Sequence, residues 1–145
     1  MSTTPQGAPQ ASALDLDDAI QQESGTLVLK HPLTGAPTTL TVQLAGVTHP
    51  LRVAHYQAKQ REIQKAMQLD GSYQLPDPAD AEVDEIDYLA RSTLGWHLVA
   101  GGQPIAFSVD AARKLYADPR RHWVRQQVSQ ALGQQELFIG GSAPA

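Results

Sequence analysis

The sequence predicts an α+β fold that is mainly helical, with an N-terminal β-hairpin packed on a bundle of about four helices. Two β-type runs around a Pro- and Gly-containing turn indicate the hairpin. Four segments with helical periodicity follow it. A chain of 145 residues can bury one modest core but not two independent ones. We therefore expect one folded domain over residues 26–139, between a disordered or weakly ordered tail (1–25) and a flexible tail (140–145).

The hairpin is expected from residues 26–30 and 39–45, which flank a turn containing Pro32, Gly35 and Pro37. In the second run apolar and polar residues alternate, so one face of that strand is predicted to be buried. A two-stranded hairpin alone is marginally stable in water. We therefore expect it to pack on a helix or on another chain.

The first helix is expected over residues 51–69, which contain no Gly or Pro and are rich in helix-forming residues. Thr48 is its predicted N-cap, since the proline at position 50 is tolerated in the first turn of a helix. The spacing of its residues predicts two faces. The apolar stripe consists of Val53, Tyr56, Ile63 and Met67, and the basic face of Arg52, Lys59, Arg61 and Lys65.

Three more helices are expected in the C-terminal half, over residues 81–94, 109–117 and 119–132. Gly95 is predicted to end the first of these, whereas Ser108 and Asp118 precede the other two as caps. The last helix again combines an apolar stripe with a basic one.

The segment between these helices, residues 96–107, is extended and apolar and is interrupted by Gly101–Gly102. It predicts either a small hairpin or an ordered loop.

The composition argues against several classes of site. The absence of cysteine excludes disulfides, thiol nucleophiles and cysteine-ligated zinc. No apolar run approaches the ~18 residues of a membrane span, and the N-terminal residues do not resemble a signal peptide. Trp123 among Arg120, Arg121 and Arg125 raises the alternative of base stacking on a basic surface. The net charge of −4 disfavours it, so we expect neither nucleic acid nor a membrane as partner.

Charge alternates in blocks along the chain. Residues 1–25 and 70–95 are acidic, whereas residues 26–69 and 96–145 are basic. Such blocks either attract one another within the fold or form charged surfaces for partners. We favour attraction within the fold, because opposite charges on one short chain meet easily.

Motifs for catalysis and cofactor binding are missing from the sequence. It contains no glycine-rich phosphate loop, no esterase elbow and no histidine pair with metal-ligand spacing. Asp80, Asp84 and Asp87 share a helical face, but their acidic neighbours near a helix start favour a solvated face over a catalytic pair. We therefore expect no catalytic residue, no metal site and no cofactor.

A string of short motifs runs through the C-terminal half. It consists of Gly95–Trp96, Gly102–Ser108, Ala111–Tyr116, Asp118–Pro119 and Phe138. The N-terminal half adds Lys30–Gly35, Thr39–Leu44 and His49–Pro50. In this order the motifs resemble the phage tail assembly chaperone family of long-tailed phages, and the resemblance covers about residues 26–139.

The resemblance implies a role in viral tail morphogenesis through protein–protein interaction, in the host cytoplasm and without enzymatic activity. Family members are thought to bind the tape measure protein and to keep it soluble while tail tube protein subunits polymerise around it. A longer, frameshifted form is common in the family, and its extension recruits the tube protein. A structural tail or neck component of the virion is the alternative function.

The candidate partner-binding residues lie in both halves of the chain. They are Val53, Tyr56, Ile63 and Met67 of the first helix, Arg120, Arg121 and Trp123 of the last helix, and Phe138 near the end. One of the two helices is expected to face a client or a second copy of the chain, which would make a homo-oligomer. The alternative is that both apolar stripes form the protein's own core.

Overall fold

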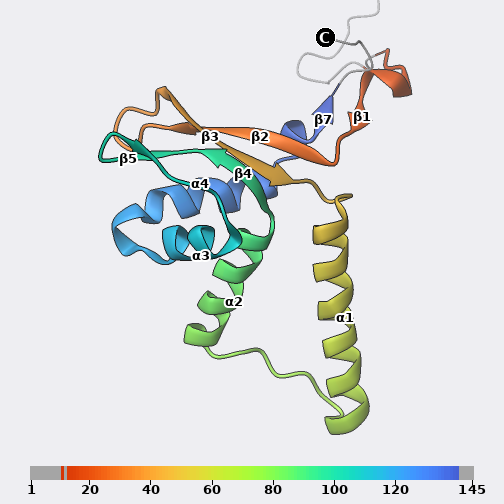
Figure 1. Cartoon of the computed structure of the whole chain (residues 1–145). Helices are drawn as coiled ribbons and strands as arrows, with labels where there is room; N and C mark the ends of the chain where they lie inside the picture. The colour runs from red at the N-terminus through yellow and green to blue at the C-terminus, as the bar shows by residue number, and fades with distance from the viewer. Residues whose placement is uncertain (1–10, 12, 141–145) are drawn as a thin grey trace, which may run out of the picture.

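The computed structural model describes residue 11 and residues 13–140 (Figure 1). Of the two expected tails, residues 1–10, 12 and 141–145 lie outside the described residues. The described part contains an antiparallel sheet of β2 (Ser24–Lys30), β3 (Pro37–Ala45) and β4 (Thr93–His97), in the order β2-β3-β4. It also contains four α-helices, so the expected α+β, mainly helical class is confirmed.

The predicted hairpin corresponds to β2 and β3, which pair in register from Ser24–Ala45 to Val28–Thr41. The turn is closed by hydrogen bonds from the His31 amide to the Ala36 carbonyl and from the Thr38 hydroxyl to the Leu29 carbonyl. Val42 and Leu44 of β3 are fully buried, as the alternation predicts, and Leu29 of β2 is buried with them.

The third strand, β4, is absent from the sequence-based prediction, which continued a helix to residue 94. The helix α2 (Pro78–Arg91) ends earlier, and Thr93 already pairs with Leu44 of β3. The Ser92 carbonyl accepts a hydrogen bond from the Ala45 amide (2.8 Å). β-Branched Thr93 and aromatic Trp96 suit this extended conformation, and pairing with β3 outweighs the helical period.

Of the two alternatives left open for residues 96–107, the structure shows the small hairpin, with strands β5 (Val99–Ala100) and β6 (Gln103–Pro104). Gly101 and Gly102 form its turn with φ angles of 58° and 77°. Two consecutive positive φ values are typical of the tight turn that joins antiparallel strands, and glycine adopts them without steric cost.

The helices α3 (Val109–Ala117) and α4 (His122–Leu132) cover one face of the sheet (Figure 1). The Ser108 hydroxyl caps α3 by accepting a hydrogen bond from the Ala111 amide (2.9 Å), as expected. The predicted single helix 119–132 divides into a 3₁₀ turn, Pro119–Arg121, and α4. Asp118 caps the 3₁₀ turn rather than α4 itself.

The core lies between the sheet and the helices. Its buried residues include Leu29, Val42, Leu44, Leu89, Ala112, Tyr116, Val128, Leu132 and Phe138. The buried Thr93 hydroxyl donates to the Leu89 carbonyl (2.8 Å) and lies 2.7 Å from the Tyr116 hydroxyl, so Tyr116 is the donor to Thr93. Burial raises the pKa of Tyr116 to about 12.

The two ends of the described chain meet beside the sheet. A 3₁₀ turn, Leu16–Asp18, leads into β1 (Ile20–Gln21), which pairs with β7 (Ile139–Gly140) after the 3₁₀ turn Gln135–Leu137. A Cβ atom on Gly25 would lie 2.5 Å from the Leu137 carbonyl oxygen. The close approach of these segments therefore requires glycine at position 25.

The outer strand β2 has a side-chain contact at its end. The Gln127 side chain of α4 accepts a hydrogen bond from the Lys30 amide and donates one to the Lys30 carbonyl, both at 2.8 Å. One side chain thus satisfies both main-chain groups of Lys30.

Helix α1 (Pro50–Asp70) departs from the expected four-helix bundle. It contains no buried residue, and in Figure 1 it projects away from the sheet, whereas α2, α3 and α4 pack with the core. Its N-cap is His49 rather than Thr48, because the His49 Nδ1 atom accepts a hydrogen bond from the Leu51 amide (3.1 Å).

Candidate functional site

The candidate site is the projecting helix α1, which we call the α1 arm (Pro50–Asp70). Its ends are fixed locally, by Pro50 in the first turn and by Gly71 in the left-handed conformation (φ 73°) after the last. Most stabilisation of protein helices comes from packing an apolar face, and isolated helices are marginal in water. None of the 21 residues of α1 is buried, so its exposed apolar side chains, such as Tyr56 and Met67, are available for a partner.

The arm is attached to the rest of the protein near its first turns. The Arg52 guanidinium donates to the Tyr88 hydroxyl (3.1 Å) and to the carbonyls of Ala45 (3.2 Å) and Leu132 (3.3 Å). The His55 ring packs on the Tyr88 ring with a centroid distance of 4.5 Å. These contacts set the direction of the arm relative to α2.

A second attachment lies at Lys59. Its ammonium group lies 5.7 Å from the centroid of the Tyr73 ring and 3.7 Å from the Glu62 carboxylate. The neighbouring Tyr73 side chain and the charge of Glu62 raise the pKa of Lys59 above its usual value. Lys59 therefore carries a positive charge at the side of the arm that faces α2.

The structure places the four predicted residues of the first helix on the surface. Val53, Tyr56 and Met67 have 37%, 64% and 51% of their surface exposed, and Ile63 is half-buried. The interpretation that this stripe forms the protein's own core is therefore wrong for α1.

Two recesses border the stripe. The upper recess, of about 540 Å³, is lined by Val47, Arg52, Val53, His55, Tyr56, Gln57, Lys59 and Tyr88. A groove of about 750 Å³ between α1 and α2 continues from it, lined by Ile63, by Tyr73, Leu75 and Pro76 of the connecting loop, and by several α2 residues. The stripe thus adjoins concave surface, and amphipathic helices bind other proteins by laying their apolar face into such grooves.

The two recesses differ in charge. The fixed charges lining the upper recess are Arg52 and Lys59, both positive. The groove below also contains Glu62 and three acids of α2, Asp84, Glu85 and Asp87. A partner that follows the stripe through the upper recess therefore meets positive charge first.

The predicted residues of the C-terminal half lie elsewhere. Trp123, Arg120 and Arg121 line a separate recess of about 200 Å³, below the β5–β6 hairpin. Trp123 is half-buried against the core. Phe138 is only 2% exposed and fills the space next to Gly25 and Gly46, so its expected place on a partner surface is corrected to the core.

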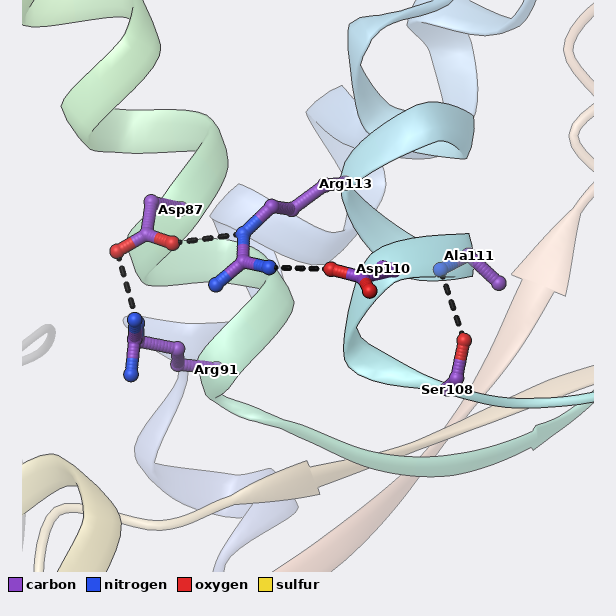
Figure 2. A network of polar contacts seen from close by, with 6 residues as sticks. All are labelled: Asp87, Arg91, Ser108, Asp110, Ala111 and Arg113. Carbon is purple, nitrogen blue, oxygen red and sulfur yellow. Dashed lines mark hydrogen bonds and ion pairs between the residues drawn. The ribbon is translucent and has the colours of Figure 1, made fainter.

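Ion pairs connect the acidic block of α2 with the basic C-terminal helices. Asp87 binds Arg91 and Arg113, both at 2.8 Å, and Arg113 also binds Asp110 (2.6 Å), as Figure 2 shows. Partial burial opposes ionisation of Asp87, but its hydrogen bonds with the two arginines hold its pKa below the usual value.

A second set of ion pairs is made by Arg125, which is 12% exposed and binds Glu82 (2.9 Å) and Glu85 (3.3 Å). The expected attraction between charge blocks within the fold is therefore confirmed for α2 with α3 and α4. It also pairs Arg113 and Arg125 with acids of α2, and Arg120 pairs with Asp118.

Two residues of the site, Arg52 as an attachment and Tyr88 as its partner, were not identified from the sequence. Tyr88 lies off the apolar face of its helix, and this position is the one local signal for a contact outside the helix bundle. Arg52 appeared as one member of a solvated basic face, but it is half-buried against the core.

Among residues 11 and 13–140 no group of three or more His, Asp or Glu side chains is arranged to hold a metal ion. Every helix in the same part of the chain is too short or too polar to cross a lipid bilayer. No family model matches the sequence, and neither curated proteins nor solved structures gave a match.

Proposed function

We propose that this protein is a phage tail assembly chaperone that binds the tape measure protein during polymerisation of the tail tube. The proposal combines the motif resemblance over residues 26–139 with the surface of the α1 arm. In it the protein acts stoichiometrically in the host cytoplasm, with no catalytic residue, cofactor, nucleic acid or membrane.

The observation that supports this function most is the apolar stripe on a helix without a buried residue. A chaperone for a long helical protein needs an accessible apolar face with polar margins, so that it covers client surface without losing its own fold. Gln57, Gln64 and Gln68 lie along one side of the stripe and Gln60 lies within it, and these polar side chains keep the free arm compatible with water.

Co-expression with the tape measure protein tests the proposal. The soluble fraction of the tape measure protein should rise several-fold with the chain present, and the two should co-purify. A tape measure protein that stays equally insoluble, or that never co-purifies, contradicts it.

Mass spectrometry of purified particles separates this function from that of a tail or neck component. The chaperone should be absent from mature virions or present far below one copy per ring of tube subunits. Stoichiometric copies in the particle would establish the structural alternative.

A further inference from the structure

The spacing of the stripe on the α1 arm matches a coiled-coil interface. Positions 53, 56, 60, 63 and 67 are separated alternately by three and four residues, which is the a/d pattern of a heptad repeat. Four of the five are apolar, and the central one is Gln60. Since α1 is a continuous helix over this range, these five positions lie along one side of it.

The charged residues at the positions of α1 that directly flank these a and d residues are of one sign, whereas the acids of the lower groove, Glu62 and those of α2, lie outside these positions. Arg52 and Lys59 occupy the positions that precede the a residues Val53 and Gln60, and the opposite flank carries Gln57 and Gln64. The two cations are the fixed charges of the upper recess. Within the described residues Arg52 donates only to neutral oxygens and meets no carboxylate. A partner carboxylate would supply the missing counter-charge.

We infer that the α1 arm is one helix of a two-helix coiled coil. The second helix is an amphipathic helix of a partner, with acidic residues beside its apolar a and d positions. Leu, Ile or Val of the partner packs on Val53, Tyr56, Ile63 and Met67, and its carboxylates approach Arg52 and Lys59. Gln60 is a polar residue at a core position, which fixes the register of the partner helix. The inference deepens the proposed function and rests on it for the identity of the client.

A second copy of α1 fits this surface less well. It would place only Gln or further Arg and Lys beside Arg52 and Lys59, so it supplies no carboxylate to either flank. Like charges across a coiled coil oppose pairing. The acidic partner helix is therefore the favoured occupant, and a homodimer is an outcome that the test detects.

Two synthetic peptides provide the probe. Each has about four heptads with Leu at a and d, and they differ only in carrying Glu or Lys at every flanking e and g position. Self-association of either peptide is weakened by repulsion between its own like charges. Fluorescence anisotropy with the full chain should show the Glu peptide binding about tenfold more tightly, or ~1.4 kcal/mol. If binding depended only on the net charge of the protein, which is −4, the Lys peptide would bind more tightly than the Glu peptide.

Three variants test the surface itself. Tyr56→Lys, at a 64% exposed core position of the interface, should weaken binding of the Glu peptide at least about tenfold. Leu69→Lys is the matched control, since Leu69 is 72% exposed and lies outside the a/d positions, and it should leave binding unchanged. Lys59→Glu should reverse the preference between the two peptides. Unchanged circular dichroism and urea midpoints show that each variant is folded.

The inference is overturned if the two peptides bind equally, or if Tyr56→Lys and Leu69→Lys have the same effect. It is also overturned if ultracentrifugation of the free chain shows a dimer that Tyr56→Lys abolishes. These results are separable from those of the proposed function. If the tape measure protein co-purifies equally with wild type and Tyr56→Lys, the proposed function stands and the coiled-coil inference fails. If the Glu peptide binds as expected but the tape measure protein does not bind, the coiled-coil inference stands and the proposed function fails.

Discussion

Helices α1 and α4 have similar patterns of apolar and basic residues, but the fold covers only one of them. Each carries an apolar stripe beside basic residues. In α4 the stripe is covered, with Val124, Val128 and Leu132 buried, whereas α1 has no buried residue. Periodicity thus predicts which residues share a helix face, but it does not say whether the chain itself covers that face.

The connections to the two helices explain the difference. α4 is joined to α3 through Asp118 and a single 3₁₀ turn, so it must lie close to the sheet that α3 covers. α1 is followed by a loop, residues 71–77, that reaches α2 without a helix or strand. Side-chain ion pairs reinforce the contrast, since Arg125 of α4 binds two carboxylates of α2.

The largest expected difference between the two regions concerns leucine truncation. Leu89→Ala, at a core position that is 1% exposed, should lower the free energy of unfolding by about 2–5 kcal/mol. The same change at Leu69 on the α1 arm, 72% exposed, should alter it by less than about 0.5 kcal/mol. Urea denaturation of both variants measures this. Equal losses would mean that the arm is covered in solution.

Alkaline pH provides a second, smaller contrast. The folded state holds the pKa of Tyr116 at about 12, against an ordinary value near 10. Neutral Tyr116 therefore contributes to the free energy of unfolding. This contribution is complete below pH 10 and is lost as pH rises toward 12, at ~1.4 kcal/mol per pH unit.

Tyr116→Phe should remove this part of the pH dependence and cost about 1 kcal/mol at neutral pH, since Thr93 keeps its bond to Leu89. Tyr56→Phe on the arm should leave the stability–pH curve as it is. Urea midpoints measured between pH 8 and pH 12 compare the three proteins. A Tyr116→Phe curve parallel to that of wild type would refute the assignment.

The smallest global effect is expected at the attachment of the arm. Arg52→Gln removes the contacts with Tyr88, Ala45 and Leu132, and should change the unfolding free energy by less than about 1 kcal/mol. Hydrogen exchange in α1 should nevertheless become several-fold faster, because local opening no longer breaks these bonds. Exchange in α4 is the internal control. A uniform increase in both helices would show that Arg52 supports the core instead.

Local signals predicted much of the fold. The β2–β3 hairpin, the cap at Ser108 and the turn at Gly101–Gly102 follow from residues close in sequence. β4 could not be predicted in this way, because Leu94 continues the helical spacing of Ile86 and Ala90, and only pairing with the distant strand β3 makes it extended.

The candidate site shows the same division. The spacing of Val53, Tyr56, Ile63 and Met67 sufficed to place them on one face of a helix. The contact between Arg52 and Tyr88 joins residues 36 positions apart, and no local pattern indicates it. Phe138 was expected on a partner surface, but the space next to Gly25 and Gly46 that buries its ring exists only in the assembled fold.

The side chain of Gln127 has a consequence for aggregation. An outer strand with unpaired main-chain groups is a template on which a neighbouring molecule can add a strand. At Lys30 both groups are already bonded to Gln127, and the lysine charge lies beside them. This end of β2 is therefore closed to strand addition by a neighbouring molecule, even where many copies of the chain are crowded together.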